Sequence, residues 1–153
     1  MPRDMSFRPD PLRLLGAAWV VAGGLVAAVT GPLRLDHGSW LAAYAVLVAG
    51  VTQYVFGVVQ GVLAVRRPSS RVVVAELVAW NAGAVGVIGG TLARLPLIVD
   101  VSGLLLGLGL GLIIHAVRGT GGPAWARWTY RILLVVILVS ILVGLVLAQL
   151  RAG

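Results

Sequence analysis

Long apolar runs, separated by short polar segments, fill the chain from about residue 14 to its end. Five of these runs reach the length of ~18 residues at which an apolar run is taken as a transmembrane helix. The polar segment at 1–13 is predicted to be a short tail, and nothing remains for a separate soluble domain. We therefore predict one membrane domain, 1–153, an all-α polytopic bundle of five transmembrane helices at about 14–31, 39–65, 72–92, 97–117 and 132–150.

Composition supports the same interpretation, because 59% of the residues are hydrophobic and only 11% are charged. A soluble domain is about half apolar and about one quarter charged. The first run also resembles a secretory signal peptide, but it is long for one and no cleavage site follows it. The chain has no cysteine, which excludes disulfides, thiolate metal sites and cysteine nucleophiles.

The arginines predict the orientation of the helices. Nine lie in the tail and in alternate loops, whereas three lie in the remaining loops and at the C-terminus. Since cytoplasmic loops carry the excess of basic residues, we expect a cytoplasmic N-terminus and an outside C-terminus. The first group is Arg3, Arg8, Arg13, Arg66, Arg67, Arg71, Arg118, Arg127 and Arg131, and the second is Arg34, Arg94 and Arg151.

The net charge of +7 does not predict nucleic-acid binding, because the arginines occupy short gaps between apolar runs and form no continuous patch. Basicity from arginine alone, with abundant Ala, Val, Gly and Leu, is typical of a GC-rich bacterial genome. We therefore expect a multi-pass protein of the bacterial inner (cell) membrane. Trp125, Trp128 and Tyr130, in the last basic loop, are expected to lie in an interfacial aromatic belt.

Glycines at four-residue spacing predict close helix packing, because small residues let transmembrane helices approach. The second, third and fourth predicted helices each carry such a spacing, so we expect these three to form the tightly packed centre. The alternative is that glycine is simply common in such a chain. The predicted packing residues are Gly57 and Gly61, Gly86 and Gly90, and Gly103, Gly107 and Gly111.

Polar residues within the second and third helices fall at matching depths of an antiparallel hairpin. Buried polar groups in a membrane need partners. We therefore predict hydrogen bonds between Gln60 and Glu76 and between Gln53 and Asn81.

Glu76 and His115 are also expected at similar depth, where a contact between them would form a proton relay. The competing interpretation is that Glu76 reaches toward Arg67 or Arg71 and that His115 lies at the interface. Together Gln53, Gln60, Glu76, Asn81 and His115 form the predicted polar intramembrane cluster.

The sequence contains residue types that bind metals and haem, but their positions do not indicate such a site. Asp36, His37 and Asp100 have the ligand types of a divalent-metal site, but their spacing does not require one. His37 and His115 are expected on opposite sides of the membrane, so they do not share a haem iron. We predict no cofactor and no metal.

Enzyme signatures are missing from the sequence, which has no Walker loop, HExxH or G-x-S-x-G motif. We therefore expect a non-enzymatic accessory, assembly or scaffold subunit that acts by helix packing in the lipid bilayer, with another membrane protein or by self-association. The alternative is a small transporter or channel with a polar path through helices two to four. A haem- or quinone-linked redox protein is a third class.

Overall fold

The structure is a computed structural model that describes residues 10–63, 69–116, 123–125, 128, 130–132, 134–137 and 139. This part of the chain is helical and contains no strand, which confirms the all-α prediction. Within the described residues, four helical segments are long and apolar enough to cross a membrane: 11–30, 38–62, 70–92 and 96–115. The protein is therefore a multi-pass membrane helical bundle.

The first span, α1, covers Pro11–Thr30 and begins three residues before the predicted start at 14. Asp10 is its N-cap, since the Asp10 carboxylate accepts a hydrogen bond from the backbone N–H of Leu12. Pro11 follows in the first turn, where a missing N–H costs no helical hydrogen bond. Residues 11–13 therefore belong to the helix and not to the polar tail.

The second span is a continuous helix made of three segments: α2 (Gly38–Ala43), η1 (Tyr44–Val51) and α3 (Thr52–Leu63). The middle segment is π-helical, so its hydrogen bonds skip one more residue than in an α-helix. The Thr52 hydroxyl donates to the carbonyl oxygen of Leu47, five residues earlier, at 2.9 Å. This bond stabilises the wider turn where η1 passes into α3.

The third and fourth spans are α4 (Ser70–Leu92) and α5 (Pro96–Ala116), joined by a tight turn. In this turn the backbone N–H of Leu95 donates to the carbonyl oxygen of Gly90. The turn after α1 has the same contact, because the N–H of Leu35 donates to the carbonyl oxygen of Thr30. Both bonds span five residues, as in a Schellman motif. Arg94 and Arg34 take the left-handed position, with φ of 56° and 49°.

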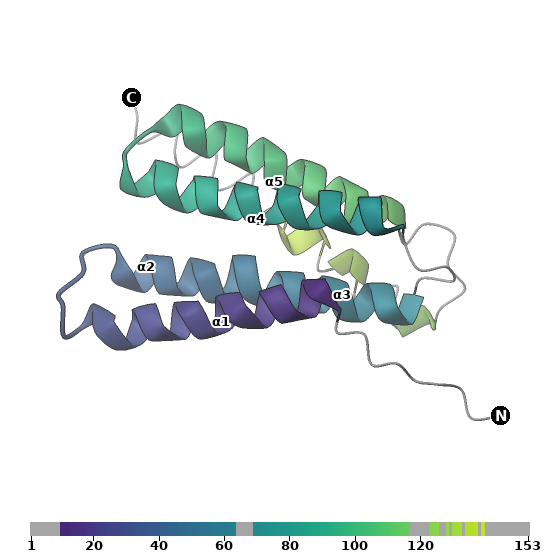
Figure 1. Cartoon of the computed structure of the whole chain (residues 1–153), viewed down its shortest axis with the longest axis horizontal. Helices are drawn as coiled ribbons and strands as arrows, with labels where there is room; N and C mark the ends of the chain where they lie inside the picture. Colours follow the sequence, from purple (N-terminus) through teal and green to yellow (C-terminus); the bar gives the residue numbers. More distant parts are fainter. Residues whose placement is uncertain are drawn as a thin grey trace.

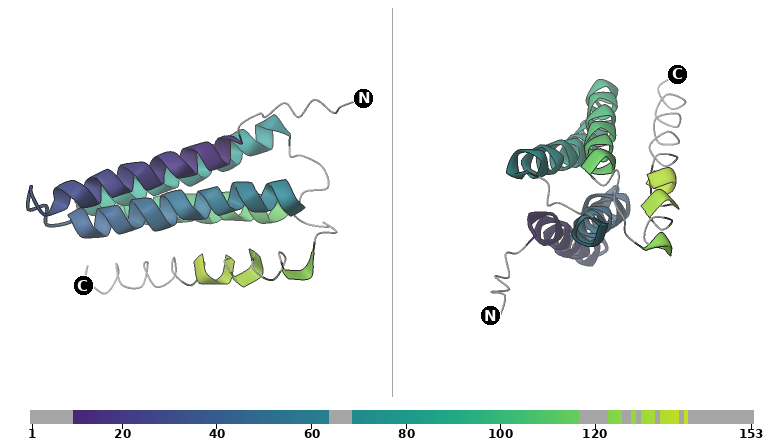
Figure 2. Two further views of the ribbon diagram at one scale, coloured as in Figure 1. Left: turned by 90° about the horizontal axis from the view of Figure 1, so that it is seen from below. Right: turned by 90° about the vertical axis from the view of Figure 1, so that its right-hand side faces the viewer.

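The spans pack as two antiparallel hairpins, and their turns lie at the same end of the molecule (Figure 1). One hairpin joins α1 to the α2–η1–α3 span, and the other joins α4 to α5. Figure 2 shows the two hairpins stacked as separate layers. We call the end with the two turns the Arg34 end, and the end where α1 and α4 begin the Arg13 end.

This pairing corrects the prediction that helices two, three and four form one tightly packed centre. Helix two packs mainly on α1, and its contact with α4 runs through η1 and α3. The sequence prediction overlooked α1, although Gly16 on α1 lies against the backbone of Gly50 and Tyr54. A Cβ at Gly16 would lie 2.7 Å from the Tyr54 nitrogen, so only glycine allows this approach.

The fifth predicted span, 132–150, lies largely outside the described residues. Its described residues, 132, 134–137 and 139, are helical. Ile137 is buried and belongs to the same apolar core as Phe56, Trp80 and Ile113.

Candidate functional site

The candidate site is the polar interface between the two hairpins, where α3 faces α4. Gln53, Phe56 and Gln60 lie three and four residues apart on α3, so they share one face of that helix. All three are buried, Gln53 and Phe56 with 0% of their surface exposed. Glu76 and Trp80, one turn apart on α4, are the facing residues, and each is also 0% exposed.

The predicted hydrogen bond between Gln60 and Glu76 is confirmed. The Gln60 Nε2 donates to the Glu76 Oε2 at 2.8 Å, and both side chains are buried. One turn deeper, the rings of Phe56 and Trp80 meet edge to face at a centroid distance of 5.2 Å. These two contacts fix the register of α3 against α4.

The predicted hydrogen bond between Gln53 and Asn81 is wrong, because Asn81 bonds to α1. The Asn81 Oδ1 accepts from the Trp19 indole Nε1–H at 2.6 Å, and its Nδ2 donates to the Leu77 carbonyl. Successive residues on a helix are rotated by about 100°, so Asn81 turns away from the face that carries Trp80. The indole donor at Trp19 was the sequence signal for this contact, and the prediction did not use it.

Several buried polar atoms near this interface have no hydrogen-bond partner within the described part of the chain. Gln53 is the most unusual, because both its Oε1 and its Nε2 are unpaired at 0% exposure. The others at the α3–α4 contact are the Glu76 Oε1 and the Trp80 Nε1. An unpaired buried polar group is costly, so each of these atoms calls for a physical explanation.

Tyr130 joins the interface from the C-terminal part of the chain. It is buried in the apolar core, whereas Trp125 and Trp128 are exposed. Tyr130 therefore faces the apolar core, and its position in an interfacial belt stays a prediction. Burial raises the pKa of the Tyr130 hydroxyl, and the nearby Glu76 adds to the shift. This hydroxyl also has no hydrogen-bond partner among the described residues.

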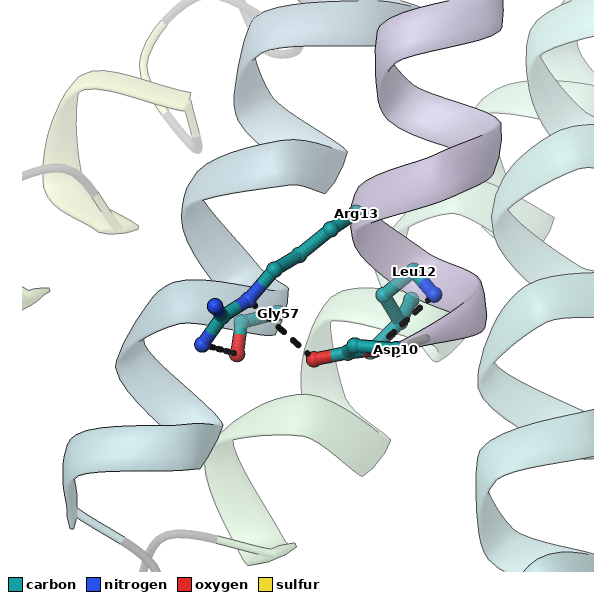
Figure 3. Close-up of polar contacts among 4 residues, drawn as sticks. All are labelled: Asp10, Leu12, Arg13 and Gly57. Carbon is teal, nitrogen blue, oxygen red and sulfur yellow. Dashed lines mark hydrogen bonds and ion pairs between the residues drawn. The ribbon is translucent and has the colours of Figure 1, made fainter. Parts of the chain in front are cut away.

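The Arg13 end of the first hairpin holds a charged contact, shown in Figure 3. The Arg13 guanidinium donates from Nη2 to the Gly57 carbonyl at 3.3 Å, and its Nε lies 3.4 Å from an Asp10 carboxylate oxygen. A Cβ at Gly57 or at Gly61 would lie less than 3 Å from the Arg13 side chain. These two glycines therefore make room for an arginine of α1.

The other predicted packing glycines divide into two groups. Gly86 lies against Ser102, and Gly90 lies against Val99, so both bring α4 close to α5. Gly103 is buried, but Gly107 and Gly111 are exposed and a Cβ there would meet nothing within 4 Å. Gly103, Gly107 and Gly111 therefore do not form the single packing surface that the sequence predicted. Gly109, which was not predicted, instead lies against the Trp80 backbone.

Gly107 and Gly111 line an open hollow of about 220 Å³ between α5 and the C-terminal residues Leu134 and Val135. Its lining is almost entirely apolar and comprises Gly107, Leu110, Gly111, Ile114, Leu134 and Val135. The hollow does not include Gln53, Gln60 or Glu76, so it is separate from the polar interface.

His115 is not part of the polar interface. Its side chain is exposed, whereas Glu76 is fully buried, and no hydrogen bond or ion pair joins them among the described residues. The proposed Glu76–His115 relay is therefore not formed. Arg71 is exposed and makes no ion pair with Glu76 in this part of the chain, and Arg67 lies outside it.

The acidic and histidine side chains do not assemble into a metal site within the described ranges. No three such residues come close enough to hold an ion, and this includes Asp36, His37 and Asp100. The polar groups at the α3–α4 interface instead combine one carboxylate with amide and indole N–H donors. Such a mixed set is suited to hydrogen bonding.

Comparison with protein-family models, with curated proteins and with solved structures finds no match for this chain.

Proposed function

We propose that the protein is a non-enzymatic accessory, assembly or scaffold subunit that packs against transmembrane helices of another membrane protein or of a second copy. The observation that carries this proposal is the apolar hollow of about 220 Å³ that contains Gly107 and Gly111. The two glycines lie one turn apart on α5, both are exposed, and no described atom lies within 4 Å of a Cβ built on either.

An open glycine pair in a transmembrane helix favours helix association. Lipid chains are as apolar as leucine, so helices associate through close packing and through polar contacts. Small residues four apart give the closest backbone approach. The exposed side chains of Leu104 and Leu108 flank the pair on α5 and would interdigitate with those of an incoming helix.

The test is to fill the hollow and measure association. In Gly107→Leu/Gly111→Leu, two leucines occupy the space that an incoming helix would enter, so association should fall several-fold. The matched control is Gly24→Leu/Gly89→Leu, since a Cβ at either glycine also meets nothing within 4 Å and neither residue lines the hollow.

Two measurements distinguish a second copy of the chain from a different subunit as the partner. Energy transfer between two labelled copies in vesicles reports self-association, and gentle detergent purification from native membranes reports a stoichiometric second subunit. Equal association of the parent chain and both double variants in both measurements would contradict the proposal.

The proposed setting is the bacterial inner membrane, with the N-terminus in the cytoplasm. The support is the nine-to-three distribution of arginines between alternate connections. Alkaline phosphatase fused after Leu33 should be active, and the same fusion after Ser69 should be inactive, because this reporter folds outside the cytoplasm. The opposite pattern would reverse the proposed orientation.

A small transporter or channel is the second candidate, and the unpaired Gln53 amide favours it. A polar group in the middle of a span is costly unless it meets a partner or a watery cavity, and such residues mark many solute paths. Purified protein in vesicles should then conduct protons or a small polar solute, and Glu76→Gln should change the rate. Vesicles no leakier than protein-free ones to a panel of such solutes would remove this candidate.

A further inference from the structure

The described part of the C-terminal segment presents two opposite faces. Its residues 128, 130–132, 134–137 and 139 are helical. Tyr130 and Ile137, seven residues apart on one face, are buried in the apolar core. At about 100° per residue, five exposed side chains lie on the opposite face, within roughly 100° of one another. We call this surface the C-terminal face, and it consists of Trp128, Arg131, Ile132, Val135 and Val139.

The chemistry of the C-terminal face changes along its length. Trp128 and Arg131 come first, with an indole N–H and a guanidinium, and three aliphatic side chains follow. Figure 2 shows that the segment starts at the Arg13 end and runs back along the bundle toward the Arg34 end. From Arg131 to Val139 the helix rises about 12 Å. The face is therefore polar near the end of the bundle and apolar further along it.

The positive charge of Arg131 has no counter-charge among the described residues. At the same end of the bundle, Asp10 lies 3.4 Å from the Arg13 guanidinium, and Glu76 is fully buried. No acidic side chain occurs between residues 101 and 153. The exposed guanidinium of Arg131 is therefore available to an anionic group from outside the chain.

The order of the groups on the C-terminal face selects the occupant. A soluble anion would match Arg131 and leave the aliphatic side chains uncovered. A second copy of this face, in the same membrane orientation, would bring an arginine and no carboxylate, so like charges would meet. A phospholipid carries a phosphate followed by acyl chains, in the same order as the face, and arginine forms paired hydrogen bonds with phosphate.

We propose that the C-terminal face binds an anionic phospholipid. The phosphate accepts hydrogen bonds from the Arg131 guanidinium and the Trp128 Nε1–H, and an acyl chain lies along Ile132, Val135 and Val139. Basic residues at the headgroup level attract anionic lipids. A zwitterionic headgroup binds less well, because its own cation offsets the gain at Arg131.

This lipid site is separate from the proposed helix-docking hollow. Of the residues that line the hollow, Val135 alone belongs to the C-terminal face. Filling the hollow at Gly107 and Gly111 and neutralising Arg131 therefore test different proposals.

Photo-crosslinking of the full chain in lipid nanodiscs tests the site. The nanodiscs contain equal amounts of phosphatidylglycerol and phosphatidylcholine, and a small fraction of one lipid or the other carries a diazirine in its acyl chain. Light releases nitrogen gas and leaves a carbene, which inserts into a C–H bond of the side chain it touches. Mass spectrometry then locates the labelled residues. At 132–139, labelling by phosphatidylglycerol should exceed labelling by phosphatidylcholine several-fold.

Two variants remove the headgroup contacts one at a time. Arg131→Gln should lower the preference for phosphatidylglycerol at 132–139 several-fold, because the cation is lost. Trp128→Phe should lower it less, because the guanidinium stays and the indole donor alone is lost.

The matched control is Arg71→Gln. Arg71 is an exposed arginine at the same end of the bundle, and the exposed Val74 and Val78 follow it along α4. Pro68 stands three residues before Arg71, where the C-terminal face has Trp128. Arg71→Gln should leave the preference at 132–139 unchanged.

Equal labelling of 132–139 by the two lipids in the parent chain would overturn the proposal. So would an unchanged preference in Arg131→Gln. An equal fall at 132–139 in Arg71→Gln would also overturn it, because it would show a general attraction of anionic lipid to the Arg13 end. In Arg131→Gln the labelling of Val74 and Val78 should not change, and a fall there as large as at 132–139 would contradict a local site.

Discussion

Among the described residues, two side-chain hydrogen bonds join the two hairpins. Gln60 bonds to Glu76 between α3 and α4, and Trp19 bonds to Asn81 between α1 and α4. Hydrogen bonds between membrane helices are worth about 0.6 kcal/mol on average and up to about 1.7 kcal/mol. Contacts of this strength set the register, whereas the apolar packing around them supplies most of the stability.

The Gln60–Glu76 pair should show positive coupling in a double-mutant cycle. Gln60→Leu leaves the buried Glu76 without its hydrogen bond and should destabilise the fold by about 1–3 kcal/mol. Combining it with Glu76→Leu should cost less than the sum of the two single changes. Unfolding in mixed detergent micelles measures all four proteins, and strict additivity would show that the bond contributes nothing.

Trp19→Phe removes the indole donor and keeps an aromatic ring. Because the Asn81 Oδ1 would then lose its partner, we expect a loss of about 0.6–1.7 kcal/mol. Trp40→Phe is the control, since Trp40 is partly exposed and contacts Tyr44 by ring stacking. A larger effect at Trp40 than at Trp19 would argue against the bond between α1 and α4.

Among the helical elements, α1 and the second span make the closest backbone approach. Gly16 lies against Gly50 and Tyr54, and Gly23 lies against Ala42 and Val46. The glycines are seven residues apart, so they share one face of α1. That face brings α1 against the π-helical segment and the start of α3.

Gly16→Ala should therefore separate the first two spans. The new Cβ would meet the Tyr54 nitrogen at 2.7 Å and the Gly50 oxygen at 2.8 Å, and backbone atoms cannot rotate away. We expect a loss of about 1–3 kcal/mol from overpacking. Gly24→Ala, where the Cβ meets open space, should be neutral or gain up to about 1 kcal/mol.

At the scale of the whole molecule, the turn after α1 and the turn after α4 lie at the same end. The two turns should therefore lie on the same side of the membrane. The native chain has no cysteine, so single cysteines can be introduced as probes. Leu33→Cys and Leu95→Cys, in the two turns, should react with a membrane-impermeant thiol reagent from the same side. Leu104→Cys, inside α5, should not react. Labelling of the two turns from opposite sides would contradict the hairpin arrangement.

Of the two predicted hydrogen bonds at the candidate site, the Gln60–Glu76 bond is confirmed and the Gln53–Asn81 bond is wrong. Gln60 and Glu76 flank the connection between α3 and α4, so chain geometry nearly fixes their depth. Asn81 has two neighbouring spans within reach at its depth, and a rotation of about 100° between adjacent residues decides which one it meets. The sequence pattern did not indicate that Tyr130 is buried in the apolar core with Phe56 and Trp80.

The amino-acid sequence is enough to show that the chain crosses a membrane several times, because the transfer of a long apolar run into lipid is a local property of that run. It also determined the register of α3 against α4 near the connection between them. The tertiary structure alone decided which spans pair, where η1 widens the helix, and which glycines stay open. These features depend on the facing surface of another helix, and lipid exerts no hydrophobic preference among such surfaces.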